Sequence, residues 1–249
     1  LGDAKEIAHL GKTIKKTVSR MRELVDDIVQ EQERLRKSEF DALQAQVNPN
    51  FLYNTVDSIV WMLDSDRHKE AISMVTALAN LFRIALSRGN NIISLRTELQ
   101  YAQYYLHIQN IRYKNKFTVA YDIQPEIEDC QTIKLIIQPI LENAIYHAME
   151  LMDGDGCIII RGYMQDEDIF IEVTDNGLGM PPEKISALLT GESNGSKKGS
   201  GIGLKNVHQR ICLYYGEAYG LQIESELDVG TTVRIHLPAR FEEPGGTMP

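Results

Sequence analysis

Apolar residues recur every seven positions along the first 45 residues of the chain. The repeat comprises Ile14, Met21, Ile28, Leu35 and Ala42, with Leu24 and Ala45 at the partner spacing. A seven-residue apolar repeat predicts a coiled-coil helix. The polar residues Glu31 and Ser38 occupy partner positions and weaken the apolar contact between helices in the middle of the repeat. We therefore predict a helix suited to relaying a change in the register of the coiled coil. An ordinary solvated helix is the alternative.

The helical pattern resumes over residues 51–63, after Asn48 and Pro49. Proline inside a helix removes a donor and clashes with the carbonyl four residues back, so we predict a bend near Pro49. A hairpin at 64–66 then leads into a second amphipathic helix ending near 88–89. We expect this helix to bury Ile72, Val75, Leu78, Ala79, Phe82 and Leu86. Two such helices make a poor isolated domain, so we predict pairing with a second copy into a four-helix bundle.

The rest of the chain alternates between periods typical of helices and of strands. Helices are predicted from Ser94, which is a cap candidate, over 132–149 and over 205–215. Strands are predicted over 117–123, 157–161, 169–174, 221–227 and 231–237. The pattern indicates an α+β fold in which helices cover one face of a mixed sheet. Residues 181–200 are rich in Gly, Ser and Lys and predict a long irregular segment.

Composition narrows the class of protein. The 249 residues carry a net charge of −9, which argues against nucleic-acid binding because that needs a basic surface. Cys130, Cys157 and Cys212 are far apart and show no metal spacing, so we expect reduced, buried thiols in a cytosolic environment. No stretch is apolar enough to span a bilayer, and no signal peptide is evident. The start at Leu1 indicates a fragment of a longer protein.

Two glycine clusters suggest a nucleotide site. Asp175 begins a turn with Gly177 and Gly179, where a carboxylate can accept a hydrogen bond from the exocyclic amine of adenine. The second cluster opens a helix whose backbone N–H groups can approach phosphates, and it comprises Gly199, Gly201, Gly203 and Leu204. The glycines fit neither a Rossmann nor a Walker A pattern. Thr231, before the last strand, is expected to support the site from below. Residues 181–199 are expected to close over the phosphates as a mobile lid.

Polar residues interrupt the apolar helix predicted over 132–149. Glu142 and Asn143 lie side by side there, and an unpartnered charge in a core is costly. The carbonyl oxygen of Asn143 is a suitable hard ligand for Mg²⁺. Glu142 could hold a metal-bound water or polarise the attacking group. His147, one turn later, could meet phosphate oxygens or be structural.

These segments, in this order, resemble the ATP-binding fold shared by histidine kinases, DNA gyrase, a heat-shock chaperone class and MutL proteins. Glu142 and Asn143 match its N box, and 175–179 and 199–203 match its two glycine boxes. The resemblance implies an α/β sandwich that binds ATP with Mg²⁺ under a flexible lid.

Residues 43–55 resemble the phosphoacceptor segment of sensor histidine kinases of the LytS/YesM type, and 94–113 resemble that subfamily's linker helix. Residues 1–37 are similar to the end of a HAMP relay with a signalling coiled coil. The resemblance implies a hairpin for dimerisation and phosphoacceptance over 38–93, a linker and ATP-binding domain over 94–241, and a loose tail over 242–249. It also implies a homodimer, a membrane-anchored parent with this part in the cytoplasm, and a response regulator with an AraC-type or LytTR output domain.

The chain departs from that subfamily at Asn50, where the subfamily has histidine. Imidazole is a good nucleophile near neutral pH, whereas an amide nitrogen has a delocalised lone pair. We therefore expect ATP binding without autophosphorylation at this position. Asn54, one turn on, could orient an acceptor, and His68 and His107 are poor substitutes. We favour an introduced substitution over a natural pseudokinase, and the sequence leaves both open.

Two other functions remain possible. A nucleotide-binding dimeric scaffold without transfer is directly compatible with Asn50. A gyrase- or chaperone-like ATPase would need a further domain supplying a lysine, and the chain ends shortly after the last predicted strand.

Overall fold

The computed structural model describes residues 20–21, 30, 49–85, 91–149, 156–181, 183, 185 and 200–241. The chain divides into two compact units, residues 1–47 and 48–249. The predicted coiled-coil repeat apart from Met21, the N-terminal side of the bend predicted near Pro49, most of the lid segment with Gly199, and the tail from 242 lie outside the described residues. No helix among the described residues is long and apolar enough to cross a membrane.

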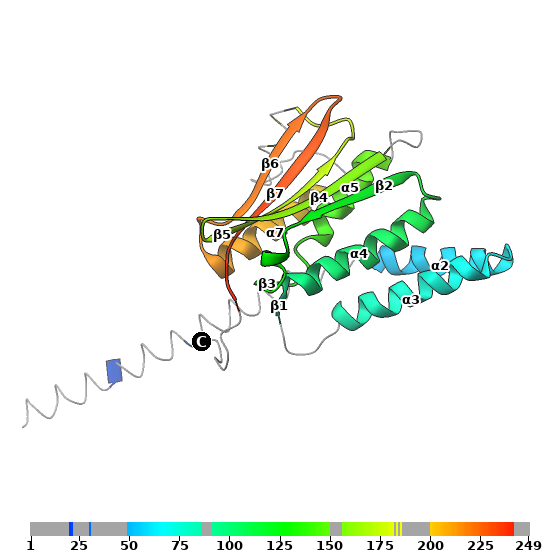
Figure 1. The fold of residues 1–249 in the computed structure, drawn as a ribbon, viewed down its shortest axis with the longest axis horizontal. Helices are drawn as coiled ribbons and strands as arrows, with labels where there is room; N and C mark the ends of the chain where they lie inside the picture. Colours follow the sequence, from blue (N-terminus) through cyan, green and yellow to red (C-terminus); the bar gives the residue numbers. More distant parts are fainter. Residues whose placement is uncertain are drawn as a thin grey trace, which may run out of the picture. The chain divides into compact units, whose positions relative to one another are not determined.

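Three helices open the second unit (Figure 1). They are α2 (Pro49–Asp64), α3 (His68–Ala85) and α4 (Leu95–Arg112). Pro49 suits the first turn of α2, because an amide there would have no carbonyl partner within the helix. The predicted hairpin is present, with Asp66 at a φ of 61° in the turn. The Oγ of Ser94 accepts a hydrogen bond from the Thr97 amide at 3.3 Å, which confirms the predicted cap of α4.

The face of α3 that packs on the rest of the unit differs from our prediction. Its buried residues are Ala71, Met74, Ala77 and Leu81. Ile72 and Val75 were expected to be buried, but they are 66% and 48% exposed in the single chain. The face that packs on α4 therefore combines Ala71 and Ala77 with Met74 and Leu81, and Ile72 and Val75 lie outside it.

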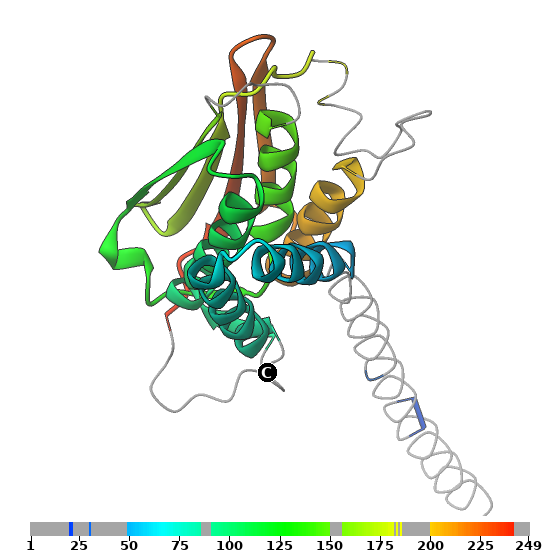
Figure 2. The ribbon, with the colours of Figure 1, turned by 90° about the vertical axis from the view of Figure 1, so that its right-hand side faces the viewer.

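A five-stranded sheet carries the second half of the unit, in the order β2-β4-β5-β7-β6. The strands are β2 (Phe117–Ile123), β4 (Gly156–Gln165), β5 (Asp168–Asp175), β6 (Gly220–Glu226) and β7 (Gly230–Pro238). β2 runs parallel to β4, and the other neighbouring pairs are antiparallel. Figure 2 shows α5 (Gln138–Met149) and α7 (Ser200–Tyr215) on the same face of this sheet. The α+β sandwich expected from the sequence is therefore confirmed.

The helix predicted over 132–149 is wrong in its first six residues. β3 (Gln131–Ile133) pairs there with β1 (Ile92–Ser94), the short 3₁₀ helix η1 (Pro125–Ile127) precedes it, and α5 begins only at Gln138. The intervening bend has Leu135 at a φ of 61°, which is a strained conformation for a bulky residue.

Two buried side chains of opposite charge, Glu98 and Arg210, hold this bend in place through its backbone. The Glu98 carboxylate, fully buried on α4, accepts hydrogen bonds from the amides of residues 135, 136 and 137 at 2.8–3.0 Å. Arg210 of α7 donates to the carbonyls of Lys134 and Leu135 at 2.5 and 3.1 Å. Burial raises the pKa of Glu98, and the amides and Arg210 oppose that rise. Charges on two other helices therefore fix the bend, and the start of α5 with it.

The three cysteines are free thiols, as expected. Cys130 is buried, whereas Cys157 and Cys212 are only partly buried.

Candidate active site

The carboxylate of Glu142 is held by a chain of hydrogen bonds that begins on α4. The Tyr101 hydroxyl donates to Gln138 Oε1 at 2.7 Å, and Gln138 Nε2 donates to Glu142 Oε1 at 2.8 Å. Tyr101 and Gln138 are 1% and 5% exposed. Burial raises the pKa of the Tyr101 phenol, so its hydroxyl keeps its proton and donates at neutral pH. Because both ends of the Gln138 amide are engaged, its orientation is fixed, and so is one oxygen of Glu142.

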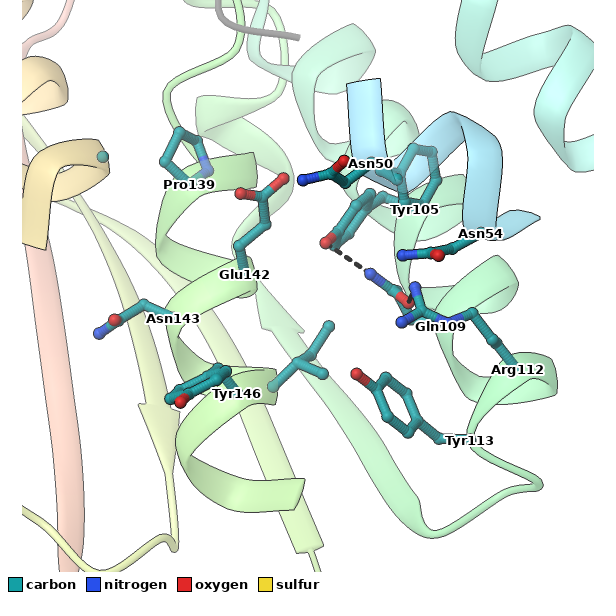
Figure 3. A pocket seen from close by; sticks show the side chains of 13 residues that line it. Asn50, Asn54, Tyr105, Gln109, Arg112, Tyr113, Pro139, Glu142, Asn143 and Tyr146 are labelled. Atoms are coloured by element: carbon teal, nitrogen blue, oxygen red, sulfur yellow. Dashed lines mark hydrogen bonds between the residues drawn. The ribbon is translucent and has the colours of Figure 1, made fainter. Parts of the chain in front are cut away.

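Glu142 lines a cavity of about 300 Å³ between α2, α4 and α5 (Figure 3). Asn50 and Asn54 of α2 line it from one side, and Glu142 and Asn143 of α5 line it from the other. In Figure 3 the side-chain amide of Asn50 is turned toward the carboxylate of Glu142. Residues that lie more than 90 positions apart in the sequence therefore share one cavity.

Phe51 determines where Asn50 lies. Its side chain is 5% exposed, and its ring centroid is 4.9 Å from that of Tyr105 on α4. The next turn of α2 is tightened by Thr55, whose Oγ1 donates to the Phe51 carbonyl at 2.7 Å. The first turn of α2 is thus anchored to α4, and the neighbouring Asn50 remains exposed toward the cavity.

Asn143 fits a metal ligand. It is 5% exposed, and its Oδ1 is buried without a hydrogen-bond partner among the described residues. A buried amide oxygen without a hydrogen bond destabilises the folded protein unless a polar group or a cation approaches it. Mg²⁺ takes few protein oxygens and completes its shell with phosphate and water. The residues present are therefore compatible with Mg²⁺ held between Asn143 and a nucleotide.

Asp175 ends β5 and lies 4% exposed. Its Oδ1 accepts a hydrogen bond from the Gly177 amide at 2.9 Å. Burial raises the pKa of its carboxyl to about 6, and hydrogen bonds from the backbone of Gly177 and Thr231 oppose the rise. A buried acceptor at the end of a strand, with an elevated pKa, is typical of a ligand site.

The turn after Asp175 requires glycine. Gly179 has a φ of 66°, and a Cβ there would lie 1.9 Å from the Glu226 carbonyl oxygen. Gly230 has a φ of 140°, and a Cβ there would lie 2.0 Å from the Asp175 carbonyl oxygen. The Ser225 hydroxyl of β6 links this turn to β7, because it accepts from the Met180 amide at 2.8 Å and donates to the Gly230 carbonyl at 2.9 Å.

The second glycine cluster opens α7. Gly203 lines the same cavity as Asn143, and a Cβ there would lie 3.4 Å from the Pro139 side chain. Gly201 lies in the first turn of α7, and Leu204 is fully buried, so its side chain belongs to the core. His147 lies on α5, but its side chain is outside the described residues.

The predicted residues fall into two groups. Asn50, Asn54, Glu142, Asn143 and Gly203 share the cavity. A second group, Asp175, Gly177, Gly179 and Thr231, lies at the adjoining ends of β5 and β7. α5 packs on β5, so one helix and one strand carry the main polar residues of both groups.

The sequence did not single out several residues of the site. Tyr105 and Arg112 line the cavity, Gln138 donates a hydrogen bond to Glu142, and Tyr101 donates one to Gln138. Tyr101 and Tyr105 read as core residues, because their spacing is that of one apolar helix face. Gln138 lies four positions before Glu142, which is the spacing of neighbours on one helix face and could have indicated it.

Comparison with known proteins agrees with this geometry. Residues 38–117 match the family described as histidine kinase, and residues 128–240 match the histidine kinase-, DNA gyrase B-, and HSP90-like ATPase family. Sensor histidine kinase YesM of Bacillus subtilis (strain 168) is 35% identical over 237 residues, which are 95% of this chain and 40% of YesM. Sensor protein LytS of Staphylococcus haemolyticus (strain JCSC1435) is 34% identical over 82% of this chain and 35% of that protein.

Among solved structures, the catalytic domain of histidine kinase ThkA aligns at 19% identity with a TM-score of 0.47, over 60% of this chain and 95% of that one. The chain spans at most 40% of the length of the curated relatives named above. In this chain a histidine kinase segment is followed by an ATPase domain, and the relatives that match most of its length are sensor histidine kinases. The chain therefore belongs to the sensor histidine kinases of the LytS/YesM type.

Proposed function

We propose that this chain is the catalytic portion of a sensor kinase that binds ATP with Mg²⁺ and is blocked at its first chemical step by Asn50. In the parent reaction the γ-phosphoryl group of ATP would pass to a histidine at position 50, and then to an aspartate of a response regulator. The observation that carries this proposal is the shared cavity of Asn50, Glu142 and Asn143.

Each side chain has a distinct task in this proposal. Asp175 accepts a hydrogen bond from the adenine amino group, and Gly177 and Gly179 let the base approach. Asn143 supplies its buried oxygen to Mg²⁺, which when bound neutralises phosphate charge. The N-terminus of α7 offers backbone N–H groups to the phosphates. Glu142 faces position 50, where it can orient an acceptor imidazole and take up its proton, and Asn54 lies one turn further along α2.

Asn50 retains the shape and polarity of the acceptor but not its nucleophilicity. The nitrogen of a carboxamide has its lone pair delocalised into the carbonyl, so it forms no stable bond to phosphorus under these conditions. The chain is therefore expected to bind nucleotide and remain unphosphorylated.

Restoring the imidazole tests the proposal. The Asn50→His protein is incubated with Mg²⁺ and γ-labelled ATP, and acid-labile, base-stable label is measured. Asn50→Gln is the matched control, because it changes the side chain and keeps an amide. Label on Asn50→His alone supports the kinase function. Absence of label on a folded, nucleotide-binding Asn50→His protein would refute it.

A second candidate function is a nucleotide-binding scaffold that signals without transfer. Asn50 favours it, because its carboxamide lines the cavity and is a poor phosphoryl acceptor. The same experiment separates the two, since a scaffold would bind ADP with either residue at position 50 and acquire no label.

We also propose that the hairpin forms a homodimer. α2 and α3 expose large apolar side chains that a monomer would leave in water, namely Val56, Val60, Leu63, Ile72 and Val75. Such a face is compatible with a second copy packing against it to form a four-helix bundle. Sedimentation of the Ile72→Lys/Val75→Lys protein should show a shift toward monomer. A dimer that is as stable as the parent would contradict this interface.

The remaining assignments extend the family relationship to this chain. We propose that the parent protein is anchored in the membrane with this portion in the cytoplasm. We further propose that its partner is a response regulator with an AraC-type or LytTR output domain. Phosphotransfer from the labelled Asn50→His protein to candidate regulators of each type would distinguish them.

A further inference from the structure

The cavity that holds Asn50 contains one cationic side chain, Arg112 (Figure 3). It is the only Lys, Arg or His among the thirteen residues that line this cavity. Arg112 is the last residue of α4, and it lies on the same side of the cavity as Asn54 and Gln109. A cation there has no part in the roles assigned above to the nucleotide and its metal.

Arg112 is held in a defined position. Its Nη1 donates to Gln109 Oε1 at 2.9 Å, and its guanidinium carbon lies 5.0 Å from the centroid of the Tyr113 ring. Gln109 is itself 6% exposed and donates through Nε2 to the Tyr105 hydroxyl at 2.7 Å. The guanidinium is therefore positioned by buried groups, which lowers the entropy cost of binding a ligand.

The same packed side chains position residue 50. Tyr105, which fixes Gln109, is the residue on which Phe51 packs at 4.9 Å. A continuous set of side-chain contacts, through Tyr105 and Gln109, therefore links the first turn of α2 to Arg112. Their separation is set by packing and not by a flexible segment.

Among the described residues, Arg112 also has no directly paired countercharge. Within the described part of the chain, no carboxylate forms an ion pair with it. Its side chain contacts a neutral amide and an aromatic ring, which leave further N–H donors of the guanidinium available to a ligand. An ordered, half-buried guanidinium without a carboxylate partner is well suited to bind a phosphoryl group through paired hydrogen bonds.

We propose that Arg112 binds the oxygens of the phosphoryl group that residue 50 receives, during transfer and after it. This inference rests on the proposed kinase function. In the step concerned, a bond forms between the acceptor nitrogen and phosphorus, and the bond from phosphorus to the bridging oxygen breaks. The electron pair leaves with ADP, and the acceptor's proton passes to Glu142 or to water. Arg112 compensates the negative charge on the three non-bridging oxygens, a contribution that guanidinium groups make in other phosphoryl-transfer sites.

The first test compares rates in the Asn50→His protein. Adding Arg112→Gln should lower the initial rate of phosphohistidine formation at saturating Mg-ATP by about 100-fold, with Mg-ADP affinity unchanged within about two-fold. Arg112→Lys should recover part of the rate, because it keeps the charge but loses the planar fork. Arg161→Gln is the matched control, since Arg161 is an exposed arginine of β4 paired with Asp122 at 3.1 Å. An unchanged rate, or an equal loss of rate and ADP affinity, would overturn the proposal.

A second test needs no catalysis and separates failure of this inference from failure of the kinase function. Asn50→Glu places a carboxylate where the phosphoryl group would lie, and Arg112 should stabilise it. In a double-mutant cycle, the fall in Tm caused by Asn50→Glu should be larger by at least about 2 °C in the Arg112→Gln background. If the Asn50→His protein acquires no label, the proposed kinase function is refuted. The double-mutant cycle then still tests whether Arg112 binds an anion at position 50. Additive changes in Tm would overturn it.

Discussion

Replacing Asp175 by asparagine should strengthen the fold and abolish nucleotide binding. Burial raises the pKa of this carboxyl from 3.8 to about 6, so the folded protein binds the proton more tightly than the unfolded chain does. Stability is therefore lost as pH rises through that window, and the full cost is present above about pH 6. A shift of about two units corresponds to about 3 kcal/mol of unfolding free energy.

Asparagine removes the charge and with it this cost. Its carbonyl oxygen can still accept the hydrogen bond from the Gly177 amide, while the bond from Thr231 is weakened by about 1 kcal/mol. The expected net gain is about 1–2 kcal/mol, or a rise in Tm of about 2–6 °C at pH 7.5 for a unit of this size. The adenine amino group, by contrast, would meet an amide in place of a charged acceptor.

Two assays on the same material check this prediction. Differential scanning fluorimetry at pH 7.5 measures Tm, and calorimetry measures Mg-ADP binding. In the parent chain, ADP affinity should also fall about ten-fold per unit as pH drops below about 6, because the protonated carboxyl is the wrong acceptor. Asp168→Asn is the matched control, since Asp168 begins the same strand and pairs with His236 at 2.7 Å. A lower Tm together with unchanged ADP affinity for Asp175→Asn would refute the reasoning.

Three further predictions concern the supports of the site. In the Asn50→His protein, Gln138→Leu should lower the phosphorylation rate about ten-fold, because the Glu142 carboxylate loses the hydrogen-bond donor that fixes one of its oxygens; an unchanged rate would contradict this. Arg210→Met should lower the free energy of unfolding in urea by about 3–5 kcal/mol, since Glu98 would remain buried without its countercharge; a loss below about 1 kcal/mol would argue against this pairing. Gly179→Ala should cost at least about 2 kcal/mol in the same assay and weaken ADP binding, because its φ of 66° and the nearby carbonyl leave no room for a Cβ; a variant with parental stability would show that the turn can relax.

Local patterns predicted much of this fold. Alternation identified β2 and the two later hairpins, and Ser94 correctly marked the start of α4. These elements are specified by neighbours in sequence, through side-chain period and turn chemistry. The glycine turn after Asp175 was predictable for the same reason, since its conformation is open to few other residues.

The errors arose where distant charges or a second surface decide the structure. Residues 135–137 are apolar, like the helix that follows them, but Glu98 and Arg210 hold them in a bend, and no local pattern reveals those distant contacts. The apolar residues of α3 form two faces, and periodicity alone did not tell which one packs on α4. Within the site, Gln138 is fixed by Tyr101 of α4, and Arg112 shares a cavity with Asn50 only once the chain has folded.

The central claim is that position 50 and the nucleotide's phosphates meet at one cavity. Mn²⁺ can replace Mg²⁺ in its complex with ADP, and it broadens NMR signals of nearby nuclei. We predict strong broadening of the Asn50 side-chain amide on adding Mn-ADP, and none in the Asp175→Asn protein. A sharp, unshifted Asn50 signal at saturating Mn-ADP would contradict the account.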